Sequence, residues 1–239
     1  MNPPDTPSLR VMAMGWHDLL FAHWRVPVAV LRPHIPDTLA IDTFEGHAWI
    51  GVVPFRMSGV RPRILPALPP FSAFPELNVR TYVSARGRPG VWFFSLDAAS
   101  RLAVRIARAT FHLPYFDASM TCRSSSGDAI EYTSERTHRN APPARFRGVY
   151  RPVGDVFQSR PGSLEHWLTE RYCLYAADAA GRVHRGDVQH PPWTLQRAEA
   201  RLDLCDMTRL IGWQPAGPPE HLLFSKDLRV TASWPVRIG

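Results

Sequence analysis

The sequence predicts a mainly β protein that folds as an antiparallel β-barrel or strongly curved sheet with one principal helix. Prolines make up 24 of the 239 residues, roughly double the average share, and prolines break long helices but occur at strand ends and in loops. Short segments of alternating apolar and polar residues recur along the chain, which is typical of strands. With 45% hydrophobic residues, the chain is expected to form a single domain over residues 1–239.

The first part of the chain is predicted to hold a strand, a helical turn and a hairpin. The strand covers residues 16–26 and ends at a proline, and a short helical turn is expected at 28–33. Residues 39–42 and 47–57 are expected to pair with each other, because a glycine-containing turn separates them.

A proline-rich segment follows at 61–74. It also carries several large apolar side chains, which argues against a flexible linker and favours a segment that packs. Two roles are open for it: it gates a pocket as a lid, or it buries itself against a second subunit of a homo-oligomer.

The clearest strand is predicted at 76–84, where polar and apolar side chains alternate. One face carries Glu76, Asn78, Arg80 and Tyr82, and the other carries Leu77, Val79, Thr81 and Val83. Residues 86–90 are expected to form a turn, and residues 91–97 the partner strand.

A helix is predicted over 101–111, with Ser100 as its N-terminal cap. Leu102, Ile106 and Ala109 are expected on its buried side, and three arginines of the same helix on a solvated stripe.

The second half of the chain is again predicted to be mostly strands. Strands are expected at 118–123, 130–138, 145–151 and 221–238, a short helix at 162–168, and a hairpin of 169–176 with 182–190. Glu170, Arg171 and Tyr172 would lie on the first arm of that hairpin, either as a structural ion pair or as part of a site. Many strands with one or two helices indicate a closed or half-closed antiparallel sheet.

The basic charge of the chain has two readings. The net charge is +7, and Lys226 is the only lysine among 28 basic residues. The arginine excess reflects either an anionic partner or a codon bias towards arginine on an ordinary surface. No dense basic run and no nucleic-acid-binding motif occur, so nucleic acid is not an expected partner.

The cysteines and the apolar segments bear on the compartment. Cys122, Cys173 and Cys205 are an odd number at wide spacing, which argues against a disulfide framework and fits a reducing cytoplasm. No segment approaches the ~20 consecutive apolar residues of a membrane span, and the first ten residues lack the features of a signal peptide. A cytoplasmic protein without membrane contact is expected.

Metal binding is not expected from the spacing of the ten histidines. Neither H-E-x-x-H nor C-x-x-C occurs. His184 and His190 would lie roughly 20 Å apart on an extended strand, whereas two ligands of one metal each lie about 2 Å from it. We expect neither a metal nor another cofactor.

The polar face of the clearest strand is the best candidate site. If it points into a barrel lumen, Arg80 can clamp a carboxylate with two hydrogen bonds, with Asn78 and Tyr82 as further substrate contacts. Glu76 can act as a general acid or base if burial raises its pKa. Arg25, at the end of the first strand, either reaches this pocket or stays at the surface. If the face points to solvent, it is an ordinary sheet surface.

Several segments resemble the DUF2071, or YqjF-like, family. In the first half they are HWRVP, LRPHIPDTL, AWIGVVPFRM, PELNVRTYV, GVWFFSLDA and FHLPYF. In the second half they are LTERYCLY at 168–175, GRVHRGDVQHPPW at 181–193 and HLLFS at 221–225. The resemblance covers nearly the whole chain.

More remotely, this family resembles acetoacetate decarboxylases, which implies a β-barrel with the active site inside and the polar face at 76–82 lining the lumen. Those enzymes form a Schiff base through a lysine whose pKa an adjacent lysine lowers. The resemblance would put that pair near 112–115, where this sequence has no lysine. His112 and Tyr115 stand there instead as candidate proton carriers, with a packed histidine as the alternative for His112. Lys226 is expected to be an exposed strand lysine.

Two functions follow from these patterns. The first is an enzyme-like pocket for a small carboxylate or oxo acid without Schiff-base chemistry, in which Arg80 holds the anion and Glu76, His112 or Tyr115 moves protons. The second is a non-catalytic domain that binds or senses a small molecule on the same barrel.

Overall fold

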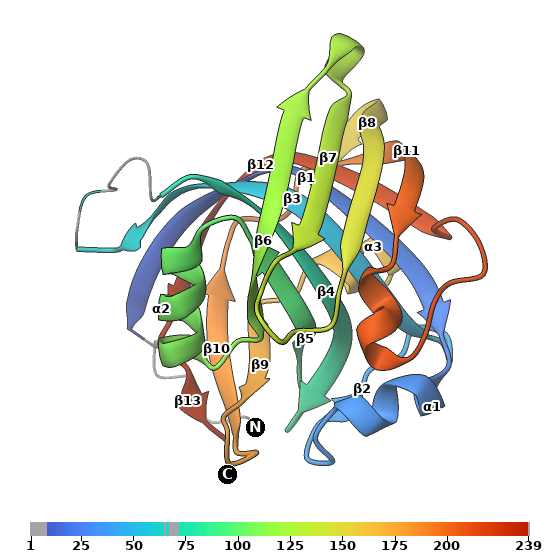
Figure 1. Cartoon of the computed structure of the whole chain (residues 1–239). Coiled ribbons are helices and arrows are strands. Elements are labelled where there is room, and N and C mark those ends of the chain that lie inside the picture. Colours follow the sequence, from blue (N-terminus) through green and yellow to red (C-terminus); the bar gives the residue numbers. More distant parts are fainter. Residues whose placement is uncertain (1–8, 65, 67–71, 239) are drawn as a thin grey trace.

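In the computed structural model, which describes residues 9–64, 66 and 72–238, all strands belong to one sheet (Figure 1). The strands are β1 (Arg10–Val26), β2 (Ala40–Ile41), β3 (Ala48–Pro62), β4 (Phe74–Ala85), β5 (Arg88–Ala98), β6 (Tyr115–Ser124), β7 (Ile130–Arg136), β8 (Arg145–Phe157), β9 (Cys173–Ala177), β10 (Val183–Gln189), β11 (Leu195–Cys205), β12 (His221–Ser233) and β13 (Val236–Arg237). The α-helices are α1 (Val28–Leu31), α2 (Arg101–Phe111) and α3 (Leu164–Thr169), and short 3-10 helices lie at Arg32–His34, Ser126–Asp128 and Met207–Ile211. None of these helices has the length and apolar content needed to cross a membrane.

Strands β5 and β12 each pair with two different strands along one edge. On the edge of β5 away from β4, Val91 and Trp92 pair with β9, whereas Leu96–Ala98 pair with β6. On the edge of β12 away from β1, the strand pairs first with β11 and then with β10. The sheet therefore closes on itself twice.

The two closures share one wall, made of β12, β1, β3, β4 and β5. The large ring is completed by β6, β7, β8 and β11, and the small ring is completed by β9 and β10. In Figure 1 the β9–β10 hairpin (orange) lies beside α2, while β6, β7 and β8 (green to yellow) extend away from it. Both faces of the shared wall are consequently covered.

Each ring has its own apolar core, because successive side chains of a wall strand point to opposite faces. The large-ring core includes Leu20 and Ala22 of β1, Ile50 and Val52 of β3, and Leu77 and Val79 of β4. The small-ring core includes Leu19 and Phe21 of β1, Val53 and Phe55 of β3, and Trp193. Polar side chains on the small-ring face of β4 are thus enclosed by protein.

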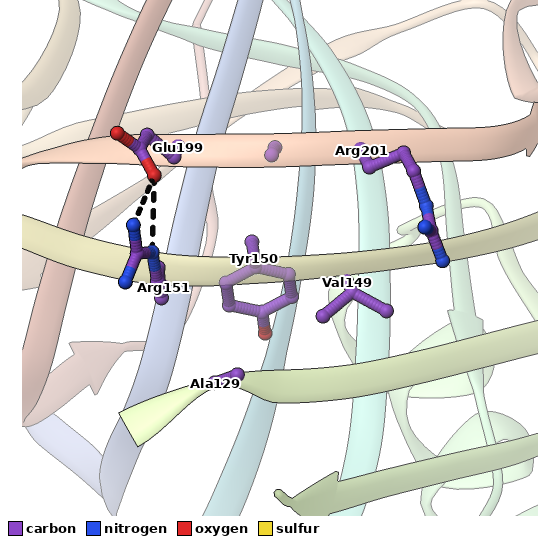
Figure 2. A pocket seen from close by; sticks show the side chains of 7 residues that line it. Ala129, Val149, Tyr150, Arg151, Glu199 and Arg201 are labelled. Atoms are coloured by element: carbon purple, nitrogen blue, oxygen red, sulfur yellow. Dashed lines mark hydrogen bonds and ion pairs between the residues drawn. The ribbon is translucent and has the colours of Figure 1, made fainter. Parts of the chain in front are cut away.

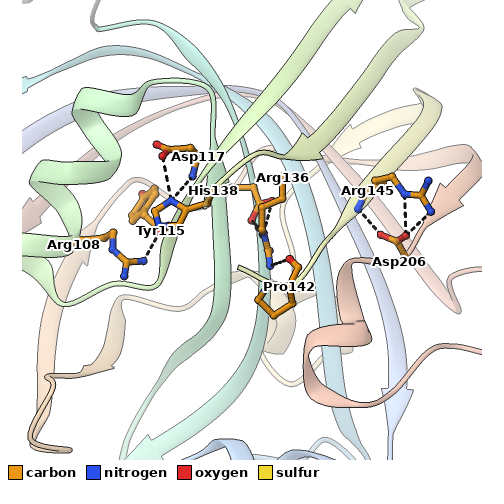
Figure 3. A network of polar contacts seen from close by, with 9 residues as sticks. Arg108, Tyr115, Asp117, Arg136, His138, Pro142, Arg145 and Asp206 are labelled. Atoms are coloured by element: carbon orange, nitrogen blue, oxygen red, sulfur yellow. Dashed lines mark hydrogen bonds and ion pairs between the residues drawn. The ribbon is translucent and has the colours of Figure 1, made fainter. Parts of the chain in front are cut away.

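A buried ion pair joins β5 to β7. Arg136 donates from Nη2 to Asp97 Oδ1 at 2.7 Å and from Nε to Oδ2 at 3.0 Å, and both side chains are 1% exposed or less. The guanidinium also lies 4.2 Å from the centre of the Phe116 ring and donates to the Pro142 carbonyl (Figure 3). Burial raises the pKa of Asp97, and the arginine opposes that shift.

Most elements predicted from the sequence are confirmed. The predicted strands at 16–26 and 76–84 lie within β1 and β4, and Ser100 Oγ accepts a hydrogen bond from the Ala103 N–H at the start of α2. Within the segment 61–74, predicted to be a lid or to bury itself against a second subunit, residues 65 and 67–71 lie outside the described ranges, and the two ends of the segment belong to β3 and β4.

The predicted pairing of 39–42 with 47–57 is wrong. β2 pairs with β4, with Ala40 opposite Ser84 and Ile41 opposite Val83. The pairing of β3 with β4 ends at Ile50 and Thr81, so the edge of β4 beyond that point is free, and β2 occupies it. The turn between β2 and β3 is reduced to a single bridge.

The predicted buried face of α2 is also wrong. Val104 is fully buried, whereas Leu102 and Ile106 are 52% and 49% exposed. Both sides of this helix carry small or apolar residues, so periodicity alone does not choose between them. The arginines decide the orientation, because Arg105 pairs with Asp117 of β6 and Arg108 donates to the Tyr115 carbonyl.

Two further differences concern the second half of the chain. β11 was not among the predicted strands, although Arg197, Glu199 and Arg201 alternate with apolar residues along it. The predicted first arm of the last hairpin begins too early, because Thr169 ends α3, residues 170–172 form a connection, and β9 starts at Cys173.

Replacing Arg136 with Met is expected to lower the free energy of unfolding by about 3–5 kcal/mol, because it leaves the Asp97 carboxylate buried without its partner. Denaturant unfolding followed by circular dichroism measures this. The double variant Asp97→Leu/Arg136→Met should recover most of the loss. A single variant as stable as the wild type would contradict a structural role for the pair.

Candidate functional site

The polar face of β4 is buried inside the small ring. Glu76, Asn78, Arg80 and Tyr82 have relative exposures of 3%, 5%, 8% and 0%. Their neighbours on the other face, such as Leu77 and Val79, belong to the large-ring core. The strand therefore carries a carboxyl, an amide, a guanidinium and a phenol in an enclosed space.

Arg80 lies in a row of side chains that crosses the shared wall. His221, His23, Gly51, Arg80 and Phe93 are successive ladder partners on β12, β1, β3, β4 and β5. A Cβ atom on Gly51 would lie 2.8 Å from His23 Nε2 and 3.6 Å from Arg80 Cγ. The absence of a side chain at Gly51 thus makes room for the imidazole and the arginine side by side.

The Arg80 guanidinium has no acidic partner among the described residues. Its carbon lies 5.3 Å from the centre of the Phe21 ring and 5.8 Å from that of Tyr82. Nη2 donates a long hydrogen bond of 3.4 Å to the Leu168 carbonyl, and Nε has no partner. A buried cation without a counter-ion is costly, so the position favours an anionic ligand.

Other polar atoms on the same face have no partner among the described residues. They are Asn78 Oδ1, Ser225 Oγ and Trp193 Nε1. A buried polar atom without a partner costs about 1–3 kcal/mol, and a bound ligand or water is one explanation for such atoms. These donors and acceptors and the Arg80 guanidinium together suit a small polar molecule.

His23 is held as a neutral imidazole. Its Nε2 lies 2.7 Å from the Tyr82 hydroxyl. Burial lowers the pKa of His23 well below its usual value, and the nearby Arg80 charge adds to the shift. At neutral pH the site therefore carries the positive charge of Arg80 and none from this histidine.

Glu76 and Tyr115 form a buried acid pair at the other end of the face. The Tyr115 hydroxyl donates to Glu76 Oε2 at 2.9 Å. Burial raises the pKa of Glu76 to about 8, with the hydrogen bond from Tyr115 opposing the shift and the Asp97 charge adding to it. Glu76 is mostly protonated at neutral pH, as a general acid must be. Because its pKa of about 8 is near neutral, a fraction is also ionised and can act as a base.

The backbone of Tyr115 is fixed by the start of β6 and by α2 (Figure 3). Arg108 donates to the Tyr115 carbonyl at 2.7 Å. Two residues further along β6, Asp117 Oδ2 forms a salt bridge with Arg105 Nη2 at 2.8 Å and lies 3.2 Å from His138 Nδ1. These contacts hold the phenol of Tyr115 on Glu76.

Arg25 and Lys226 do not enter this space. The Arg25 side chain is 53% exposed, pairs with Glu220 at 3.5 Å, and lies over the Trp49 ring. The Lys226 side chain is 65% exposed, and its Nζ lies 3.1 Å from Asp18 Oδ1. The expectation of an exposed strand lysine is confirmed.

His112 lines a different pocket. It caps the C-terminal end of α2, and its ring centre lies 4.7 Å from that of His184. This pocket, of about 260 Å³, is lined mainly by residues of β5 and β9 and of the segment after α2. No contact joins His112 to Glu76, so the two predicted proton carriers are not brought together.

The site contains residues that the sequence reasoning did not select. His23 lies on the same face of β1 as Phe21, and Ser225 lies on the same face of β12 as Leu223. The alternation of side chains along these two strands could therefore have identified both residues. Arg171, for which the sequence left open a structural ion pair or a place in a site, enters from the connection between α3 and β9 and pairs with Asp42 at 2.6 Å. Asp42 is distant in sequence, so no local pattern predicts it as the partner.

A second surface pocket, of about 380 Å³, lies over β8 and β11 (Figure 2). Its three charged side chains are paired: Arg151 donates to Glu199 at 2.7 Å, and Arg201 pairs with Asp203 at 3.1 Å. It therefore lacks the unpaired groups that characterise the interior of the small ring. No group of three or more potential metal ligands lies together anywhere in the described ranges.

The DUF2071 family model, described as an uncharacterized conserved protein, matches residues 13–229. The chain belongs to the DUF2071 family. Within it, the chain is 45% identical to the uncharacterized protein YqjF of Bacillus subtilis (strain 168) over 237 residues, which cover 99% of this chain and 95% of that protein.

The fold of this DUF2071 protein is acetoacetate decarboxylase-like. It is similar to the acetoacetate decarboxylase of Legionella pneumophila, with a TM-score of 0.63, 9% identity, and coverage of 100% of this chain and 93% of the other. An acetoacetate decarboxylase-like enzyme of Sphingomonas wittichii RW1 gives 0.64 at 12% identity, with coverage of 97% and 94%. The enduracididine biosynthesis enzyme MppR complexed with pyruvate gives 0.54 at 9% identity, with coverage of 99% and 91%. The family and the fold predicted from the sequence are confirmed.

The raised pKa of Glu76 predicts how stability depends on pH. Between its ordinary value of 4.5 and its folded value of about 8, the unfolded chain has released the proton and the folded chain retains it. The free energy of unfolding of the wild type therefore falls as pH rises through this window, by about 1.4 kcal/mol per unit from this group. Glu76→Gln should not show this component.

Denaturant unfolding at several pH values in this window measures the difference between Glu76→Gln and the wild type. The difference should grow in favour of the variant as pH rises. Glu199→Gln, on an exposed ion pair, is the matched control and should give a nearly constant difference. A constant difference for Glu76→Gln as well would show that its pKa is not raised.

Proposed function

We propose that this chain binds a small carboxylate or oxo acid inside the small ring, with Arg80 holding the carboxylate. The observation that carries the proposal is the buried Arg80 guanidinium without an acidic partner in the described part of the chain. Arginine binds carboxylates through two parallel hydrogen bonds. The fold relatives include MppR complexed with pyruvate, which supports an oxo acid as the ligand class.

The remaining polar groups fit the rest of such a ligand. Asn78 lies between Arg80 and Glu76 on the same face, and its Oδ1 has no hydrogen-bond partner in the described part of the protein. Consecutive residues on one face of a strand are about 6.6 Å apart. A ligand with its carboxylate at Arg80 would place its carbonyl group near Asn78 and its next carbon towards Glu76.

We propose further that the reaction is proton transfer at the carbon next to the ligand carbonyl. Ionised Glu76 would take the proton as the C–H bond breaks, and Tyr115 or Asn78 would donate a hydrogen bond to the resulting enolate oxygen. Return of the proton from Glu76 would complete the cycle. With a pKa of about 8, about one Glu76 in ten is ionised at pH 7, so the activity would rise with pH.

A lysine Schiff base has no part in this proposal. Lys226 is the only lysine of the chain, and it is exposed and lies beside Asp18 rather than inside the ring. The chain has no second lysine beside it and Lys226 lies outside any buried pocket, so both means of activating a nucleophilic lysine are missing.

The second candidate is a domain that binds the same ligand without turning it over. Glu76 is mostly neutral at neutral pH and accepts a hydrogen bond from Tyr115. A carboxyl group in this state is a poor base, which favours this alternative. In that case the acid pair would only donate a hydrogen bond to the ligand.

Arg80→Met is expected to weaken the binding of pyruvate or acetoacetate about 10- to 100-fold, because a charge-assisted hydrogen-bonding partner is lost. Isothermal titration calorimetry measures the dissociation constants. Arg151→Met, on a surface ion pair, is the matched control and should bind like the wild type. Unchanged affinity in Arg80→Met would refute the assignment of the carboxylate site.

Exchange of the methyl protons of pyruvate for deuterium, followed by NMR, distinguishes catalysis from binding. The proposed base predicts an exchange rate that rises with pH up to about 8 and falls about 100-fold or more in Glu76→Gln. Binding without exchange supports the second candidate. A borohydride-reducible adduct on Lys226 would overturn the exclusion of Schiff-base chemistry.

A further inference from the structure

Strand β5 pairs first with β9 and then with β6, and a pocket is lined by residues around the point where its partner changes. We call it the fork pocket. Its volume is about 260 Å³. It is lined by His34, Trp92, Phe93, Phe94, His112, Pro114, Tyr175, Ala176, Ala177, Leu210 and Ile211.

The fork pocket follows from the pairing of β5. Residues 93–95 lie between the stretch paired with β9 and the stretch paired with β6, so β4 is their only strand neighbour. The register with β4 shifts here, since Val79 faces Ser95 while Arg80 faces Phe93. Such bulges redirect side chains and are over-represented next to active sites.

The chemistry of the lining is aromatic and uncharged. Three aromatic residues of β5 and Tyr175 of β9 supply rings, and no Arg, Lys, Asp or Glu is among the lining residues. His34 and His112 add two imidazoles that make ring contacts but no hydrogen bond to the described protein. A planar ring with a polar substituent is the ligand group that matches this lining.

His112 holds its place at some conformational cost. Its φ is 55° in the left-handed region at the end of α2, a position that glycine or asparagine usually takes. Its ring packs on His184, whose Nε2 lies 3.2 Å from Asp178 Oδ2. A non-glycine residue kept in this conformation points to a use for its side chain in the pocket.

The fork pocket adjoins both ends of the interior site. Phe93 lines the pocket and is the ladder partner of Arg80. It packs against the cluster of Tyr82 as well as against the cluster of Ala176. Pro114 lines the pocket and directly precedes Tyr115, whose hydroxyl is bonded to Glu76.

We propose that the fork pocket binds the aromatic ring of the ligand whose carboxylate Arg80 holds, so that the ligand class is an aryl-substituted oxo acid. This rests on the proposed function. At about 30 Å³ per water-sized group, the volume accommodates about nine such groups, or one ring with a short chain. Phe93 lies where the two subsites adjoin, because it lines the fork pocket and is the ladder partner of Arg80.

Three probes test the proposal by calorimetry: pyruvate, phenylpyruvate, and phenylacetone, which has the ring but no carboxylate. The wild type should bind phenylpyruvate about 10- to 100-fold more tightly than pyruvate, because the ring is buried. Ala177→Phe fills the fork pocket and should abolish this advantage while leaving the affinity for pyruvate unchanged, which also shows that the variant is folded. Ala179→Phe, in the exposed turn after β9, is the control and should preserve the advantage.

Phenylacetone separates this proposal from the proposed function. It should bind equally to the wild type and to Arg80→Met, and not to Ala177→Phe. If phenylacetone gives this pattern while oxo-acid binding does not depend on Arg80, the ring subsite is supported and the proposed carboxylate site is refuted. Equal affinity for phenylpyruvate and pyruvate, or an advantage that survives in Ala177→Phe, overturns the inference.

Discussion

The shared wall of β12, β1, β3, β4 and β5 constrains everything else in this structure. Because β5 and β12 each pair with two strands along one edge, the wall is covered on both faces. An amphipathic strand in such a wall has no solvent face for its polar side chains. The polar residues of β4 are therefore buried, and their charge and hydrogen-bonding capacity must be met from inside the small ring.

Two buried arginines show the difference between structural and ligand-directed charge. Arg136 is neutralised by Asp97, donates a hydrogen bond to a backbone carbonyl and packs on an aromatic ring. Its charge and its hydrogen-bonding groups are therefore met by the protein itself. Arg80 has two aromatic rings, one long hydrogen bond and no carboxylate within the described chain. Since an uncompensated buried charge destabilises a fold, Arg80 is best explained by a partner that arrives with the ligand. The raised pKa of Glu76 on the same strand has the same origin, which is burial.

The sequence predicted what depends on local alternation and failed where distant segments meet. The polar face of β4 was found because side chains in a strand alternate, and the same parity could have found His23. Alternation could not show that the other face of β4 is buried too, since that depends on the double pairing of β5 and β12. Arg171 enters from an irregular connection without a pattern. His112 was selected with Tyr115 because the resemblance places the decarboxylase lysine pair near 112–115, but the helix end directs His112 into the fork pocket.

The central claim is that the Arg80 guanidinium is the counter-ion of a carboxylate ligand. A crystal structure of the protein grown with saturating pyruvate tests it most directly. The account predicts electron density for the carboxylate within hydrogen-bond distance of the Arg80 guanidinium, with the rest of the molecule directed towards Asn78 and Glu76. An Arg80 side chain paired with a carboxylate of the protein itself, or pyruvate bound only outside the small ring, would contradict it.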